Sequence, residues 1–134
     1  MEYEKLPHDH GENNIDSIQE ISENIENFRV ISDIFRQLGD VTRVRIFWIL
    51  CHCEECVLNI AAMMHMSSPA VSHHLRLLKS SGLISSRREG KEVYYHVSDL
   101  PQSFLLHEMI EEVMKIACPD MDRLPADLDH RKNR

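Results

Sequence analysis

Apolar and polar positions between Met64 and Ile84 follow the pattern of a turn and a short amphipathic helix. Val71, Leu75 and Leu78 lie four and three residues apart, so they share one face of a helix. Gly82 follows shortly afterwards, as is typical of a residue that ends a helix. The opposite face is polar and carries Ser72, His73, Arg76 and Lys79.

The start of this helix carries capping signals. Ser67 or Ser68 can accept a hydrogen bond from the first turn, and Pro69 fits there because its missing N–H is not needed. Residues 57–65 come before it and have apolar positions at helical spacing. Together, residues 57–80 predict a helix-turn-helix, a motif whose second helix lies in the major groove of DNA.

A basic hairpin is predicted directly after this helix, at about residues 84–98. Glycine stands in the turn at 89–91, and apolar and polar side chains alternate from Val93 to Val97, the period of a half-buried strand. The cations at its tip are Arg87, Arg88 and Lys91. A helix-turn-helix followed by a basic two-stranded wing predicts a winged-helix domain of the mostly α (α+β) class.

Helical periodicity recurs outside this motif. The sequence predicts four further helices, at residues 15–28, 29–38, 43–50 and 101–118. Gly39 separates the second from the third, and Asp40 or Thr42 can cap the third. We expect residues 51–56 to be a short connection.

The first and last of these helices carry apolar stripes that a winged-helix core does not need. The simplest explanation is that they cover each other across a two-fold axis. The homodimer would place two recognition helices about one DNA turn, ~34 Å, apart on an inverted repeat. We therefore expect a mobile acidic arm at 1–14, a winged-helix domain with added dimerisation helices at 15–118, and a polar tail at 119–134.

Charge is distributed unevenly along the chain. The net charge is −7, and residues 1–27, with eight acidic residues and one lysine, account for all of it. Residues 66–91 contain five cations and one anion, a local balance of +4. Binding to nucleic acid follows such a local patch, so an acidic total does not exclude DNA.

The sequence also limits where the protein is found. No apolar run approaches the ~20 residues that span a bilayer, and no signal peptide is recognisable. We expect a cytoplasmic protein without a membrane partner. Its cysteines would be reduced unless they bind metal or carry out redox chemistry.

The recognition helix and the segments before it resemble the ArsR/SmtB family of winged-helix repressors. Ser-Ser-Pro-Ala-Val-Ser-His-His-Leu-Arg-Leu-Leu at 67–78 is similar to the family's Ser-Gln-Pro-Thr-Val-Ser-x-His-Leu-x-x-Leu. Residues 38–47 and 55–60 are also similar, and the resemblance runs from about Phe28 to Ser98. It implies a homodimeric repressor that leaves its operator when a metal ion or another thiol-reactive signal binds.

The metal sites of that family match only in part. One site uses both cysteines of a Cys-Val-Cys motif, and here Cys56 fits the first while Leu58 replaces the second. Another uses Asp-x-His early in the last helix and His-x-x-Glu near its end. Residues 99–101 lack that histidine, and Glu112 with Lys115 stands in place of the second pair. Because a protonated lysine cannot bind zinc, the resemblance does not extend to that last-helix site.

Soft metal ligands gather at residues 51–56. Cys53 and Cys56 have a chelating spacing, and Cys51 can add a third sulfur. His8 or His10 can supply a fourth ligand. Such thiolates suit zinc, cadmium, lead, arsenite or cuprous copper. In the alternative interpretation Cys51 faces the core and the other two are simply exposed loop cysteines.

A redox function for the cysteines also stays open. Some members of the family sense oxidants or persulfides through one cysteine before the turn motif and one in the last helix, which here implies Cys51 and Cys118. A disulfide needs Cα atoms within ~7 Å and a thiol of low pKa. His52 favours such a pKa, whereas Glu54 and Glu55 oppose it.

Two groups of DNA contacts are expected. The residues facing base edges are Ser68, Pro69, Ser72, His73 and Arg76. Those holding the phosphates are Lys79, Arg87, Arg88 and Lys91. His74 matches a family histidine and is expected to be half buried. His107 and Glu111, four residues apart, can chelate a metal, although an exposed salt-bridging face explains them equally well.

Other classes of protein fit less well. A thiol enzyme with Cys53 as nucleophile would lack an oriented base and a pocket, so we expect no enzymatic activity. A metal-buffering or interaction module with a dormant turn motif, and a repressor without any sensor, remain alternatives.

Overall fold

The computed structural model describes residues 6–11 and 14–118. The chain forms two compact units, residues 1–35 and 36–134. Residues 6–11 are exposed and contain neither helix nor strand. The rest of the predicted acidic arm and the predicted tail at 119–134 lie outside the described residues, so the predicted domain boundaries stay predictions.

The N-terminal segment forms two helices, α1 (Ile15–Ser22) and α2 (Ile25–Leu38). The break between them comes earlier in the chain than the sequence predicted. The predicted break after Phe28 is wrong, because the chain turns at Glu23 and Asn24 instead. The Asn24 side chain accepts a hydrogen bond from the backbone N–H of Asn27 at 3.3 Å, which caps the start of α2. Apolar spacing continues across this turn, so periodicity alone placed the break too late.

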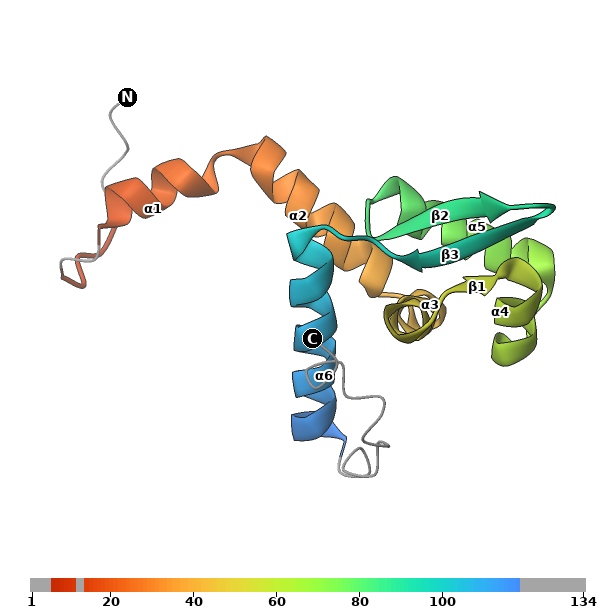
Figure 1. The fold of residues 1–134 in the computed structure, drawn as a ribbon. Coiled ribbons are helices and arrows are strands. Elements are labelled where there is room, and N and C mark those ends of the chain that lie inside the picture. The colour runs from red at the N-terminus through yellow and green to blue at the C-terminus, as the bar shows by residue number, and fades with distance from the viewer. Residues whose placement is uncertain (1–5, 12–13, 119–134) are drawn as a thin grey trace. The chain divides into compact units, whose positions relative to one another are not determined.

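The second unit has the order of elements of a winged helix. Its helices are α3 (Val41–His52), α4 (Val57–Met64), α5 (Ser68–Ser80) and α6 (Pro101–Ala117). Its strands are β1 (Glu55–Cys56), β2 (Ile84–Glu89) and β3 (Glu92–Val97). They form an antiparallel sheet with β3 in the centre, and the tip of the β2–β3 hairpin extends away from α6 (Figure 1). The predicted mostly α winged-helix fold is confirmed.

The segment 51–56 is not the simple connection that the sequence predicted. Cys51 and His52 continue α3, while Glu55 and Cys56 pair with Tyr95 and Tyr94 of β3. The strand is too short to show an alternating pattern, and it forms because β3 offers a free edge. This pairing attaches the cysteine-bearing segment directly to the wing.

The core lies where the helices of the turn motif meet the base of the sheet. The predicted apolar face of α5, Val71, Leu75 and Leu78, is fully buried. It packs with other buried side chains, which include Ile46, Phe47, Leu50, Ile60, Leu83 and Ile84. Burial of this kind contributes about 1.5–3 kcal/mol per large apolar side chain.

Capping residues and a glycine determine where the helices around this core begin and end. Asp40 caps α3 by accepting a 2.9 Å hydrogen bond from the Arg43 N–H, and Ser67 caps α5 by accepting one of 3.3 Å from the Ala70 N–H. Gly82 ends the turn after α5 with φ of +79°, a conformation that favours glycine. These caps determine where the recognition helix begins and where the wing leaves it.

Several helices keep apolar side chains exposed. No residue of α1 or α2 is buried. Helix α6 buries Leu106 but exposes five large apolar side chains: Phe104, Leu105, Met109, Val113 and Ile116. None of the described helices has the length and apolar content needed to cross a membrane.

Candidate nucleic-acid interface and metal-ligand cluster

Helix α5 presents a polar face opposite its buried one. Ser68 and Ser72 are partly exposed on this face. The more exposed residues there are Pro69, His73, Arg76 and Lys79. A helix that enters a DNA groove needs this arrangement, because its apolar face is packed against the core while its polar side chains face the solvent.

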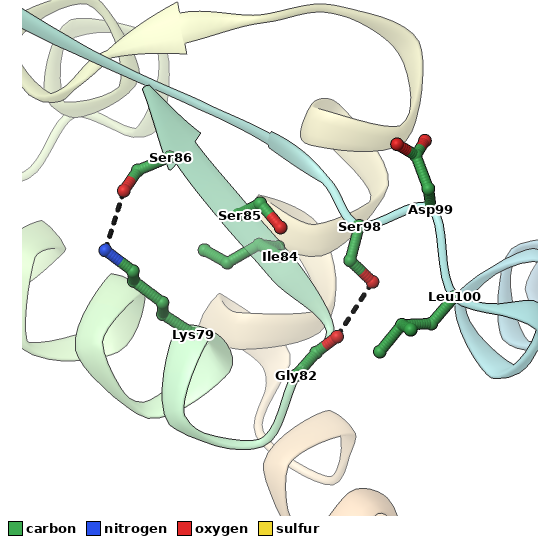
Figure 2. A pocket seen from close by; sticks show the side chains of 8 residues that line it. All are labelled: Lys79, Gly82, Ile84, Ser85, Ser86, Ser98, Asp99 and Leu100. Atoms are coloured by element: carbon green, nitrogen blue, oxygen red, sulfur yellow. Dashed lines mark hydrogen bonds between the residues drawn. The ribbon is translucent and has the colours of Figure 1, made fainter. Parts of the chain in front are cut away.

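The wing is joined to the last turn of α5. Lys79 donates a 2.7 Å hydrogen bond from Nζ to Ser86 Oγ on β2, beside an open pocket (Figure 2). On the other side of that pocket, Ser98 donates from Oγ to the Gly82 carbonyl at 2.7 Å. The helix end and both strands of the hairpin are therefore positioned relative to each other before any DNA binds.

Arg87 already has anionic partners in the DNA-free structure. Its Nε donates to Glu54 at 2.8 Å, and its Nη1 donates to Glu89 at 2.7 Å. The guanidinium also lies 4.9 Å from the centroid of the Tyr94 ring. Hydrogen bonding to these carboxylates raises the pKa of Arg87, and the same bond lowers the pKa of Glu54. By contrast, Arg88 and Lys91 are exposed at the hairpin tip.

His74 lies on the side of α5 that faces α3. Its Nδ1 is 3.3 Å from Nη1 of Arg43, whose Nε donates to the Gln37 carbonyl at 2.9 Å. Desolvation by burial lowers the pKa of His74, and because a guanidinium can only donate, Nδ1 is the acceptor of this hydrogen bond. The expected half-buried position is confirmed.

The four cysteines differ in exposure. Cys51 and Cys56 are partly buried, whereas Cys53 and Cys118 are exposed. Desolvation, followed by the charge of Glu55, raises the pKa of Cys53. A higher pKa leaves less of the nucleophilic thiolate at neutral pH.

Within the described part of the chain, no thiol belongs to a group of three possible ligand atoms that lie within 4.8 Å of one another. The predicted three-sulfur site at Cys51, Cys53 and Cys56 is thus not assembled inside one described subunit. It stays a prediction, as does the Cys51–Cys118 pair.

The structure assembles a different group of ligand-capable side chains. His52 at the end of α3 meets His107 and Glu111 of α6, and their donor atoms lie within 4.8 Å of one another. The sequence indicated the helical spacing of His107 and Glu111, and it placed His52 among the cysteines. It missed the combination, because only the packing of α6 against the end of α3 joins the two.

Comparison with known proteins agrees with this geometry. Residues 40–86 match the model of the family described as "Bacterial regulatory protein, arsR family". A cadmium resistance transcriptional regulatory protein CadC homolog from Staphylococcus aureus is 40% identical over 84 residues, which cover 58% of this chain and 69% of that protein. The chain belongs to the ArsR family.

Two further similarities concern the sequence and the fold. A transcriptional repressor SmtB homolog from Synechocystis is 34% identical over 91 residues, which cover 68% of this chain and 69% of that protein. A homodimeric winged helix-turn-helix domain from Mycobacterium bovis, described as a possible ArsR-family regulator, has a TM-score of 0.65 at 23% identity and covers 81% of this chain and 92% of its own. As a member of the ArsR family, the chain is a DNA-binding transcriptional repressor and not an enzyme.

Proposed function

We propose that this protein is a homodimeric, sequence-specific repressor that reads an inverted repeat with α5 and holds the DNA backbone with the β2–β3 hairpin. The observation that carries the proposal is the two-sided burial of α5. Its apolar face is fully buried, while its polar face is exposed and is connected to the wing through Lys79 and Ser86.

Within this interface the residues divide by chemistry. Ser68, Ser72, His73 and Arg76 face base edges around Pro69, because they occupy the outer face of the helix. Lys79, Arg88 and Lys91 neutralise phosphates. Arg87 joins them only by exchanging Glu54 or Glu89 for a phosphate, so its contribution to affinity is smaller.

The homodimer is supported by the exposed apolar side chains of α1 and α6. Ile18 and Ile21 are 56% and 66% exposed, and Val113 and Ile116 are 53% and 83% exposed. Apolar surface of this kind on a soluble protein marks an interaction site. The similar domain from Mycobacterium bovis is described as homodimeric, which favours a second copy of this chain as the partner.

DNA binding is tested with sites selected from a random-sequence duplex library, followed by fluorescence anisotropy. Arg76→Ala should weaken binding to the selected site by about 1–3 kcal/mol and relax specificity at one base position. Lys115→Ala on α6, which removes the same charge from an ion pair with Glu112, is the matched control. Equal affinity of Arg76→Ala, Lys79→Ala and the control would contradict the proposal and favour a buffering or interaction module.

We further propose that a thiophilic metal ion or metalloid at Cys51, Cys53 and Cys56 regulates DNA binding. One of the similar transcriptional regulatory proteins is named for cadmium resistance. The segment is also attached to the wing, because Cys56 pairs with Tyr94 and the adjoining Glu54 binds Arg87. A ligand that reshapes this segment would therefore move the wing.

The alternative is a redox switch that joins Cys51 and Cys118. Both are tested by adding zinc, cadmium, lead, arsenite, cuprous copper or a mild oxidant to the reduced protein–DNA complex. Metal regulation predicts thiolate absorption bands and release of DNA, both lost in Cys53→Ser/Cys56→Ser. Release by the oxidant alone, lost in Cys118→Ser, would favour the redox switch. Release by none of them would indicate a repressor without a thiol sensor.

A further inference from the structure

We propose that His52, His107 and Glu111 form a binding site for one divalent transition metal ion of the zinc type within a single subunit, separate from the cysteines. His52 is the last residue of α3, and the other two lie on successive turns of α6. Since these elements are more than fifty positions apart in the chain, their convergence is a property of the fold.

The three donor atoms are arranged as a metal site requires. His52 Nε2 lies 3.0 Å from Glu111 Oε1, and His107 Nε2 lies 2.8 Å from the same oxygen. The two Nε2 atoms are 3.2 Å apart. Around a tetrahedral zinc ion with ligands at ~2.0–2.1 Å, donor atoms lie roughly 3.3–3.4 Å from one another. The ion therefore requires the three side chains to spread by only a few tenths of an ångström.

The two imidazoles share one acceptor oxygen. A neutral imidazole has one N–H, and a carboxylate only accepts hydrogen bonds. If both Nε2 atoms carry hydrogens, both donate to Glu111 Oε1, and the two donor nitrogens lie 3.2 Å apart. If only one does, the lone pair of the other faces the carboxylate oxygen at 3.0 Å or 2.8 Å. A cation at the centre interacts favourably with all three atoms.

The surroundings also fit a metal ion. The His107 and Glu111 side chains are only 3% and 7% exposed, so a bound ion would be largely shielded from water. The His52 side chain, at 10%, is the most exposed of the three and marks the side of entry. Its ring lies 4.5 Å from that of Trp48, which limits its rotation. A His₂Glu donor set holds zinc with a fourth position left for water.

The site lies at one end of a helix whose other end supports the recognition helix. At the N-terminal end of α3, Arg43 contacts His74 of α5. A metal ion that joins the C-terminal end of α3 to α6 would restrict movement of the frame that holds α5. This regulatory consequence rests on the proposed function, whereas metal binding itself does not.

The experiment is a Co²⁺ and Zn²⁺ titration of the reduced, full-length protein without DNA. Co²⁺ binding is read from its visible absorption, and both ions are read from the fluorescence of Trp48, the single tryptophan. We expect one ion per subunit at this site, in addition to any ion that the cysteines bind, and a change in the Trp48 fluorescence. Glu111→Gln and His52→Gln should lose affinity by at least about 10–100-fold, the loss typical of removing even an outer partner of a ligand.

Two control proteins separate this site from the rival explanations. Glu112→Gln changes an exposed neighbouring carboxylate, and Cys51→Ser/Cys53→Ser/Cys56→Ser removes the thiolates. Glu112→Gln should bind Co²⁺ as the wild-type protein does, and the triple cysteine variant should still bind one Co²⁺ per subunit at the histidine–glutamate site. The proposal is overturned if the wild-type protein binds no Co²⁺, or if the triple cysteine variant loses the ion while Glu111→Gln keeps it. Should Glu111→Gln fail to fold, His52→Gln at the helix end carries the same test.

A second measurement tests the regulatory consequence. Zinc should change operator affinity by about 5–150-fold, as allosteric couplings usually do, and His52→Gln should abolish the change. If DNA binding itself fails, the titration above still decides whether the metal site exists. If DNA binds equally well with and without zinc, the regulatory consequence is wrong and the metal is structural.

Discussion

Helices α1 and α5 both carry apolar residues at helical spacing, yet these apolar faces differ in how much of their surface is exposed. In α5, Val71, Leu75 and Leu78 are fully buried, and in α1, Ile18 and Ile21 are 56% and 66% exposed. An amphipathic pattern thus indicates that a face is to be covered, but it does not say whether the same subunit covers it.

Helix α6 combines both situations on one element. It buries Ser103, Leu106 and His107 within its own unit, while Leu105, Met109 and Val113 stay exposed. Three of its four buried residues, Ser103, His107 and Glu111, are polar. The last helix is therefore positioned by hydrogen bonds, such as the 2.6 Å contact between the Ser98 and Ser103 hydroxyls, and its apolar face stays available for a second copy.

The largest expected effect concerns the buried stripe. Leu75→Ala should lower the free energy of unfolding by about 2–5 kcal/mol, because it removes a fully buried side chain and leaves a cavity. Leu58→Ala on the exposed side of α4 is the matched control and should change it by less than about 0.5 kcal/mol. Denaturant unfolding measures both, and equal losses would contradict the assigned core.

The next effect concerns the exposed stripe. Ile18→Asp should weaken dimerisation by about 1.5–3 kcal/mol, the value of one buried apolar side chain, which is roughly 10–150-fold in the dissociation constant. Ser17→Asp places the same charge on the neighbouring position of α1 and should have little effect. Sedimentation of both variants over a concentration series decides between them. An unchanged dimer with Ile18→Asp would show that α1 does not contribute to the interface.

A smaller effect is expected at the start of α3. Asp40→Ala should lower the free energy of unfolding by about 0.5–2 kcal/mol at neutral pH, because the N-cap of α3 is lost. The hydrogen bond from the Arg43 N–H lowers the pKa of Asp40 below its ordinary value of 3.8. The stabilisation is thus present above that value and is lost as the pH falls through the lower folded pKa.

The difference in the free energy of unfolding between the wild type and Asp40→Ala should therefore disappear as the pH is lowered, which acid-unfolding curves measure. Thr42→Ala, the other residue that the sequence offered as a cap, is the control and should leave stability at neutral pH nearly unchanged. A larger loss with Thr42→Ala would contradict the assigned cap.

The smallest effect concerns the charge balance of the wing. Glu54→Gln frees Arg87 from one of its partners, so DNA affinity should rise and the logarithmic salt dependence should steepen by up to about 0.9, the value of one phosphate contact. Glu92→Gln, an exposed carboxylate on β3, changes the same charge without touching Arg87 in the DNA-free structure. If both variants raise DNA affinity equally, the gain comes from the change in net charge and not from the loss of the Glu54–Arg87 ion pair.

Much of the DNA-reading unit was predictable because its signals are local. The spacing of Val71, Leu75 and Leu78 predicted both faces of α5, and Ser67 and Gly82 marked its limits. The turn at Asn24 was missed because a single cap competes there with an unbroken apolar period. Strand β1 was missed because two residues carry no period, and only the edge of β3 makes them a strand.

By itself, the sequence determined the winged helix, the outward polar face of α5 and the basic hairpin, since each depends on residues within a few positions of one another. Only the tertiary structure decided that Arg87 binds Glu54 and that His52 meets His107 and Glu111. These contacts join residues that are thirty or more positions apart. Helical and strand periods carry no information over such distances, which are bridged only when the helices pack around a common core.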